Sequence, residues 1–170
     1  MNLKTSVLDV PGFPREGLHF KDITPLFSDA AAFARAIEAM AEPVLPLHPT
    51  HVLGLESRGF IFGSALAHKL GLGFVPARRA GKLPRPVLRE TFATVCGEEG
   101  LEIHQDALQA GDRVLIVDDI LASGATAAAA RNLVERAGAH PLALTTFIEM
   151  VGAGGREALK GMPVFSVLTY

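Results

Sequence analysis

The sequence predicts an α/β fold in which a mainly parallel central sheet is flanked by helices on both faces. Segments of strand-like apolar character alternate along the chain with segments of helical character, as is typical of parallel strands joined by helical crossovers. Hydrophobic residues make up 49% of the 170 residues and charged residues 20%, so the chain can bury a substantial core. This length suits one domain, which we place at 1–170.

The individual elements follow from apolar periodicity and from residues that begin or end helices. Ser28 or Asp29 can cap a first helix, which Pro43 then breaks. Gly71 ends the next helix, and Pro76 indicates an edge position or a strand end. The expected strands are 51–55, 74–78, 101–104, 113–118, 141–148 and 163–168, and the expected helices are about 28–41, 59–70, 124–137 and 154–160.

In two segments the apolar residues follow neither the helical nor the strand period. Residues 1–28 are rich in proline and glycine, and we expect them to form a small N-terminal hood over a site. Residues 79–100 carry glycine, proline and mixed charge, which predicts a long mobile loop. Loops of this length in a compact domain are usually functional, so we expect this one to close over the same site.

The most informative stretch runs from Arg113 to Thr126. Four apolar residues predict a buried strand, and the small residues of Ala122–Thr126 predict a turn into a helix. Backbone N–H groups in such a turn can approach an anion closely, and the dipole of the following helix favours negative charge there. Ser123 and Thr126 add hydroxyl donors. Open α/β sheets bind ligands at this kind of junction, so the turn predicts a phosphate site.

Two adjacent acids, Asp118 and Asp119, end the same predicted strand. Carboxylates repel a phosphate, but they accept hydrogen bonds from sugar hydroxyls. The two features together predict a ligand that contains a ribose 5-phosphate unit. A Walker A loop is excluded because no Gly-Lys-Ser or Gly-Lys-Thr occurs, and a dinucleotide fingerprint is excluded because Gly124 is the only glycine in the turn.

A second turn, Glu56–Gly59, follows the strand 51–55 in the same way. Arg58 offers a planar fork for phosphate oxygens, although it could equally be a surface arginine paired with Glu56. Basic residues also cluster on the segment 78–89 and could be a solvated face or an anion site; they are Arg78, Arg79, Lys82, Arg85 and Arg89. Nucleic acid is disfavoured for this cluster because Phe92 is the only aromatic residue among them.

These motifs resemble those of the type I phosphoribosyltransferases, and in particular the adenine branch of that family. The matching segments appear in the family's order and are 113–126, Phe20–Leu26, Leu55–Gly63 and Gly81–Pro84. The resemblance implies the fold of that family and a purine-salvage reaction. In that reaction the 5-phosphoribosyl group of phosphoribosyl pyrophosphate passes to adenine, which gives AMP and pyrophosphate. It also implies Mg²⁺ as cofactor and a homodimer.

The resemblance also implies roles for individual residues. The implied catalytic residues are Arg58, Lys82, Asp118 and Asp119. The implied phosphoribosyl-pyrophosphate and AMP site consists of Glu56, Ser57, Arg58, Arg78, Lys82, Asp118, Asp119, Ala122, Ser123, Gly124, Ala125 and Thr126. The implied base-binding residues are His19, Phe20, Lys21 and Ile120. Mg²⁺ is expected to bind through substrate oxygens and water, without direct protein ligands. The peptide between Glu56 and Ser57 is expected to be cis.

The chain departs from the family pattern at two places. Val95-Cys96-Gly97 stands where the adenine branch usually carries Glu-Tyr-Gly, so a glutamate credited with proton transfer or loop closure is absent at that position. Ala125 stands where the family usually has glycine. If that position needs a positive φ, alanine costs about 1 kcal/mol or more, whereas at a negative φ the change is mild.

Two alternative functions stay open on the sequence. The chain could use a 6-oxopurine in place of adenine, or it could be a catalytically weakened nucleotide-binding regulator with the same fold. Composition narrows the partners: a net charge of −2 gives no support for nucleic acid or a membrane surface. The single cysteine fits a reducing compartment, and no apolar stretch approaches the ~20 residues of a membrane span. The N-terminal residues lack the apolar core of a signal peptide, so we predict a cytoplasmic protein.

Overall fold

The computed structural model describes residues 2–17, 19–94 and 97–170. The chain divides into two compact units, residues 1–39 and 40–170, and each is described separately below. The first unit therefore extends beyond the hood that the sequence predicts at 1–28 and takes in most of the first long helix. Val95 and Cys96, where the chain departs from its family pattern, lie outside the described residues.

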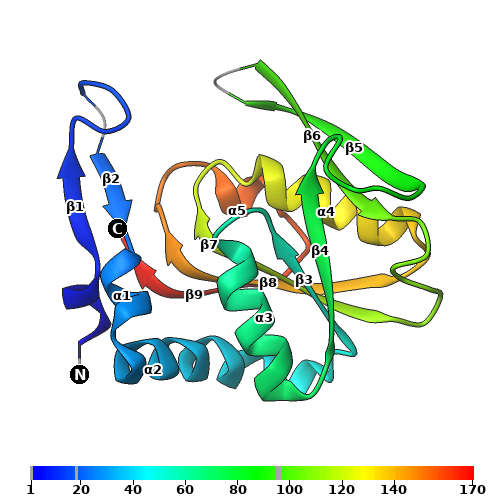
Figure 1. Cartoon of the computed structure of the whole chain (residues 1–170), viewed down its shortest axis with the longest axis horizontal. Coiled ribbons are helices and arrows are strands. Elements are labelled where there is room, and N and C mark those ends of the chain that lie inside the picture. The colour runs from blue at the N-terminus through cyan, green and yellow to red at the C-terminus, as the bar shows by residue number, and fades with distance from the viewer. Residues whose placement is uncertain (1, 18, 95–96) are drawn as a thin grey trace. The chain divides into compact units, whose positions relative to one another are not determined.

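The first unit contains a two-stranded antiparallel hairpin followed by helices (Figure 1). Its elements are η1 (Leu3–Ser6), β1 (Leu8–Pro11), β2 (His19–Asp22), α1 (Thr24–Ser28) and α2 (Ala30–Ala41). Asp29 caps α2, because its Oδ1 accepts the N–H groups of Ala31 and Ala32, each at 3.0 Å. This confirms the predicted start of the helix. The hairpin was not predicted, since its strands are only four residues long.

The second unit is built on a seven-stranded sheet with the order β5-β6-β4-β3-β7-β8-β9 (Figure 1). The elements are η2 (Glu42–Leu47), β3 (His51–Leu55), α3 (Gly59–Leu70), β4 (Gly73–Arg79), β5 (Val87–Thr94), β6 (Gly97–His104), β7 (Arg113–Leu121), α4 (Ala125–Arg136), β8 (His140–Glu149), α5 (Gly155–Ala158) and β9 (Val164–Thr169). β3, β4, β7, β8 and β9 pair in parallel, which confirms the mainly parallel sheet.

Helices α3 and α4 cover opposite faces of this sheet. The connections from β3 to β4 and from β7 to β8 run in opposite directions along the sheet, so right-handed crossovers place their helices on opposite sides. Leu133 of α4 packs in the same buried cluster as Leu53 of β3. On the α3 side, the ring of Phe62 stacks on Phe147 of β8 with centroids 5.4 Å apart.

The sequence-based prediction of a long irregular loop at 79–100 is wrong. β5 and β6 form an antiparallel hairpin, which pairs with β4 through Arg78 and Arg79 and extends the sheet at one edge. Leu88 and Phe92 pack against the main core, and this burial stabilises the hairpin although local periodicity is weak. The mobility expected for the segment stays a prediction.

Two strands also differ from expectation in their surroundings. β4 lies inside the sheet rather than at its edge, but β6 pairs with it only at Arg78 and Arg79. Pro76 is therefore paired on one side only, with Gly54 of β3, so the N–H that proline lacks is not needed by a second neighbour. β7 continues past its predicted end at Asp118 to Leu121, because β8 pairs with it along this extension.

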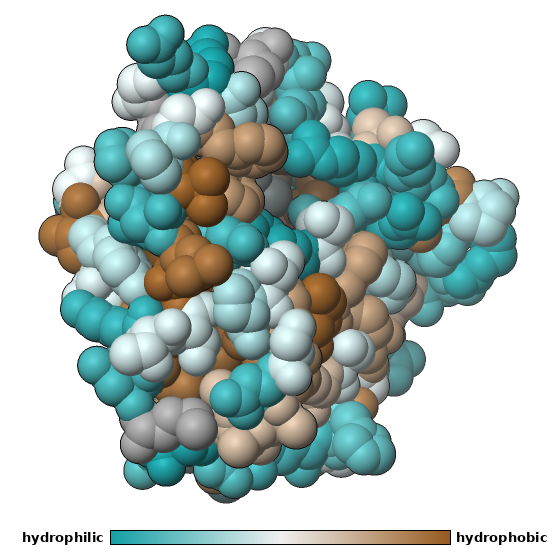
Figure 2. Space-filling model, turned by 60° about the vertical axis from the view of Figure 1, so that its left-hand side comes forward, coloured by the Kyte–Doolittle hydropathy of each residue, from teal (hydrophilic) through white to brown (hydrophobic). Residues whose placement is uncertain are grey.

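The surface is mixed in character. On the face that Figure 2 shows, apolar residues in brown are interspersed with hydrophilic residues in teal. Within the described residues, no helix combines the length and the apolar character that crossing a membrane would require.

Candidate active site

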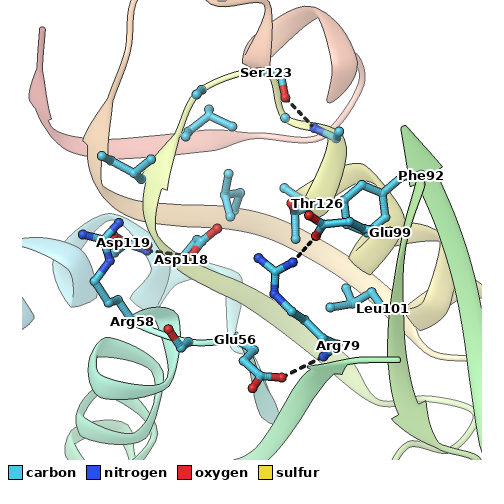
Figure 3. A pocket seen from close by; sticks show the side chains of 18 of the residues that line it. Glu56, Arg58, Arg79, Phe92, Glu99, Leu101, Asp118, Asp119, Ser123 and Thr126 are labelled. Atoms are coloured by element: carbon cyan, nitrogen blue, oxygen red, sulfur yellow. Dashed lines mark hydrogen bonds and ion pairs between the residues drawn. The ribbon is translucent and has the colours of Figure 1, made fainter. Parts of the chain in front are cut away.

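A cavity of about 320 Å³ lies in the second unit at the carboxyl ends of β3 and β7 (Figure 3). Its lining joins the two turns that the sequence singled out to one wall of the β5–β6 hairpin. The lining residues with roles below are Glu56, Ser57, Arg58, Arg79, Phe92, Glu99, Leu101, Asp118, Asp119, Ile120, Ala122, Ser123, Gly124, Ala125 and Thr126. The cavity therefore brings most of the predicted phosphoribosyl site together.

The two acids of β7 sit in different environments. Asp119 is buried, and its Oδ2 lies 2.8 Å from Nη2 of Arg58. Asp118 Oδ1 accepts the N–H of Asp119 at 2.9 Å. Desolvation and the neighbouring charge of Asp119 raise the pKa of the Asp118 carboxyl well above its usual value. The contact of Arg58 with Asp119 Oδ2 is an ion pair that lacks hydrogen-bond geometry, so this buried oxygen keeps the capacity to accept a hydrogen bond from a ligand hydroxyl.

Gly59 lets the N-terminus of α3 approach these acids. A Cβ at this position would lie 2.9 Å from the carbonyl oxygen of Val117 and 3.0 Å from Asp118 Oδ1. Because real Cβ atoms rarely tolerate such contacts, any larger residue would push the Glu56–Arg58 turn away from Asp118. The close packing of this turn on β7 keeps Arg58 within reach of Asp119.

The turn Ala122–Thr126, which we call the phosphate turn after its predicted ligand, has the geometry that its small residues predict. Gly124 has φ +80° and precedes α4, which begins at Ala125. The N–H of Ala125 donates to Ser123 Oγ at 3.4 Å (Figure 3). The positive φ thus falls on glycine, and Ala125 is not among the described non-glycine residues with positive φ. Alanine at position 125, where the family usually has glycine, therefore carries no cost from a positive φ.

The basic residues are placed differently from the prediction. Arg78 Nη2 and Nε donate to the two carboxylate oxygens of Glu56 at 3.0 and 3.3 Å, and Glu56 Oε2 also accepts the N–H of Arg79 at 2.7 Å. These bonds, with Arg78 first, lower the pKa of Glu56. Arg78 and Lys82 do not line the cavity, whereas Arg79 does. The peptide between Glu56 and Ser57 is cis, as the resemblance implied.

The hairpin contributes lining residues that are not among the predicted phosphoribosyl-binding and base-binding residues. Phe92 of β5 and Glu99 of β6 are direct cross-strand partners and face the cavity together with Leu101. Arg79 Nη1 contacts Glu99 Oε2 (Figure 3). In the structure, exposed and partly buried positions alternate over Val87–Thr94, as is typical of a strand. The sequence shows this alternation poorly, because charged and small residues occur at both kinds of position.

The predicted base-binding residues fall in both units. Ile120 lines the cavity of the second unit. His19, Phe20 and Lys21 lie on β2 of the first unit, where His19 Nδ1 and Lys21 Nζ contact the Asp9 carboxylate at 2.9 and 3.1 Å. Phe20 packs edge-on against Phe13, with centroids 5.1 Å apart. Base recognition by these three residues stays a prediction.

The charge of the lining bears on cofactor binding. Two guanidinium groups face four carboxyl groups, those of Glu56, Glu99, Asp118 and Asp119, so the formal balance is −2 when all are ionised. Within the described residues no cluster of three or more histidine, cysteine, aspartate or glutamate side chains could hold a metal ion. The lining therefore offers a polyanionic ligand no net positive charge, and Mg²⁺ bound through substrate oxygens and water stays a prediction.

Comparison with known proteins shows the family of this chain. The phosphoribosyl transferase domain family matches residues 23–167. An adenine phosphoribosyltransferase of Carboxydothermus hydrogenoformans is 50% identical over all 170 residues and over its own full length. The crystal structure of the enzyme from Rhodothermus marinus superposes with a TM-score of 0.94 at 46% identity, covering 99% of this chain and 96% of that one.

A third relative carries ligands. The adenine phosphoribosyltransferase of Saccharomyces cerevisiae, solved with an imino-altritol bisphosphate and adenine, has a TM-score of 0.92 at 41% identity, with 98% and 96% of the two chains covered. Fold, cavity and domain match together define the class: a phosphoribosyltransferase with a type I fold. Sequence identities of 41–50% over nearly whole chains narrow this class to one family. The chain belongs to the adenine phosphoribosyltransferase family.

Proposed function

We propose that this protein transfers the 5-phosphoribosyl group from phosphoribosyl pyrophosphate to adenine, giving AMP and pyrophosphate in purine salvage. The observation that carries the proposal is one cavity that holds both the Asp118–Asp119 pair and the Ser123–Thr126 turn. The relatives named above support adenine as the base, and no observation favours a 6-oxopurine or a regulator without catalysis.

The geometry supports a displacement at the anomeric carbon of the ribose. The turn at Ser123–Thr126 holds the 5-phosphate, and Asp118 and Asp119 accept hydrogen bonds from the ribose hydroxyls. A ring nitrogen of the purine attacks the anomeric carbon while the bond to pyrophosphate breaks, and the proton of that nitrogen passes to the released pyrophosphate or to water. Negative charge then accumulates on the departing pyrophosphate, and Arg58 lies where it can stabilise that charge.

Each charge contact of this kind is typically worth on the order of 3 kcal/mol in a site without water. Arg78 and Lys82 are proposed to join Arg58 once substrate is bound, although Glu56 holds Arg78 in the free protein. Mg²⁺, bound to substrate oxygens and water beside the two aspartates, would neutralise part of the diphosphate charge. Closure of the β5–β6 hairpin would exclude water, which otherwise hydrolyses the activated sugar.

We further propose a cytoplasmic homodimer. The family resemblance supports the dimer, and the single cysteine of the sequence is consistent with a reducing compartment. Leu45 and Ile61 of the second unit expose 53% and 41% of their surface and could contribute to an interface. Light scattering coupled to size exclusion tests the dimer, and a monomer at micromolar concentration would contradict it.

A steady-state assay tests the reaction. With Mg²⁺ and phosphoribosyl pyrophosphate, we expect AMP from adenine and little product from hypoxanthine or guanine, because an unmatched hydrogen-bonding edge leaves buried polar groups unpaired. Removal of Mg²⁺ by a chelator should abolish turnover, and its addition should restore it. Absence of AMP under these conditions would reject adenine as the substrate.

A further inference from the structure

Glu99 and Arg79 form an ion pair inside the cavity. Arg79 ends β4, and its backbone N–H donates to Glu56 Oε2 at 2.7 Å, which anchors the start of the side chain beside the Glu56–Arg58 turn. Its Nη1 contacts Oε2 of Glu99, which β6 directs toward the same space (Figure 3). Both residues line the cavity together with Asp118 and the phosphate turn.

The cavity holds two guanidinium groups, and each one contacts a carboxylate. Arg58 contacts Asp119, and Arg79 contacts Glu99. An anionic ligand must compete with these carboxylates for the same N–H donors. The two pairs differ in burial: the side chain of Asp119 is 9% exposed, whereas that of Glu99 is 30% exposed. A released Glu99 carboxylate can be solvated by water, so its pair with Arg79 is the easier one to exchange.

Building on the proposed function, we propose that Glu99 is the counter-ion of Arg79 in the free enzyme. When substrate binds, the Arg79 guanidinium leaves Glu99 and binds the diphosphate of the substrate. The 5-phosphate binds at the Ser123–Thr126 turn, so the diphosphate is the anionic group left for an arginine anchored beside Glu56. Glu99 is then a positioning residue. It keeps Arg79 oriented into the cavity, weakens diphosphate binding and so favours release of product pyrophosphate.

The substitution Glu99→Gln tests this exchange. It removes the competing charge and keeps the size of the side chain, so the Kd for inorganic pyrophosphate should fall about three- to fivefold, which corresponds to the energy of a partly exposed ion pair. The KM for phosphoribosyl pyrophosphate should fall with it, whereas the KM for adenine and the Kd for AMP should change less than twofold. Calorimetry gives both dissociation constants, and a circular dichroism spectrum checks folding.

Glu98→Gln is the matched control, because Glu98 is exposed, neighbours Glu99 and does not line the cavity. It removes the same charge and should leave the Kd for pyrophosphate within twofold. In an Arg79→Gln background, Glu99→Gln should produce no further tightening, since the pair no longer exists. Tighter binding confined to Glu99→Gln with Arg79 present would support the exchange.

Three results would overturn the inference: weaker pyrophosphate binding by Glu99→Gln, equal tightening by Glu98→Gln, or tightening that persists without Arg79. The proposed function is tested separately by AMP formation in the wild-type protein. Failure to form AMP would reject the reaction and leave the pyrophosphate measurements as the test of the ion pair.

Discussion

Replacing Gly124 by alanine tests the phosphate turn most sharply. Gly124 has φ +80°, and a Cβ there would lie 2.8 Å from the carbonyl oxygen of Gly155 and 2.9 Å from Cβ of Ala158. Both the backbone conformation and the contact with α5 therefore oppose a side chain. Gly138, beyond the other end of α4, has φ +81° and no atom within 4 Å of a built Cβ. Gly138→Ala thus isolates the conformational part of the effect.

The expected magnitudes follow from these two environments. The left-handed conformation costs an alanine about 1–2 kcal/mol, which both variants share. The crowding against Gly155 and Ala158 adds about 1–3 kcal/mol in Gly124→Ala alone. The gain from restricting the unfolded chain is the same for the two substitutions and cancels between them. We therefore expect Gly124→Ala to be less stable than Gly138→Ala by about 1–3 kcal/mol.

Urea unfolding of the two variants measures the difference in free energy, and calorimetry with AMP measures the effect on the site. Gly124→Ala should weaken AMP binding at least tenfold, because a shift of about 1 Å misplaces the N–H groups that are proposed to bind the phosphate. Gly138→Ala should bind AMP like the wild type. Equal stability of the two variants together with unchanged AMP binding by Gly124→Ala would refute the reasoning.

Two further predictions concern carboxyl groups whose pKa values are shifted in the folded protein. Asp118→Asn should abolish AMP formation but stabilise the free protein at neutral pH, because the raised pKa of Asp118 makes wild-type stability fall as pH rises above about 4. Glu149→Gln should destabilise the protein by about 1–2 kcal/mol at pH 7, since Arg156 and Ser166 bind that carboxylate and lower its pKa. Urea unfolding between about pH 3 and pH 8, which includes the range where carboxyl groups titrate, measures both changes in the free energy of unfolding.

The pH dependence separates the two cases. The advantage of Asp118→Asn over the wild type should grow as pH rises above about 4, whereas the disadvantage of Glu149→Gln should shrink as pH falls from about 4.3, where the unfolded chain takes up the proton, toward the lowered pKa of the folded carboxyl. A constant difference across the range would contradict the assignment for either residue. Glu157→Gln, at an exposed position next to Arg156, is a suitable control for loss of charge alone.

Local sequence signals placed many of the elements correctly. β3 and α3 have the predicted bounds, because the signals that define them lie within a few residues: an apolar run for the strand, and for the helix the left-handed Gly71 at its end. A cap at Ser28 or Asp29 was predicted for the same reason, and Asp29 makes it. The β5–β6 hairpin was not, since its strands depend on each other, on β4 and on packing against the core. Such pairing carries little local signature.

In the candidate site, too, local features were predicted from the sequence and long-range contacts were not. The acids of β7 and the small turn after them predicted a sugar-phosphate cavity, because the carboxyl end of a parallel strand presents both to one ligand. The sequence did not reveal that Glu56 holds Arg78 or that Arg79 faces Glu99, since these pairs join residues at least 20 positions apart. Which of two adjacent arginines enters the cavity depends on the alternation of β4.

By itself, the sequence determined the kind of ligand and the fold class of this protein, because side-chain chemistry, glycine placement and apolar period are properties of neighbouring residues. Tertiary structure alone decided which charges meet. It buried Asp119 against Arg58, raised the pKa of Asp118 and brought the hairpin's Glu99 to Arg79. Electrostatic energies depend on distance and desolvation in space, and only the packed sheet sets either of these.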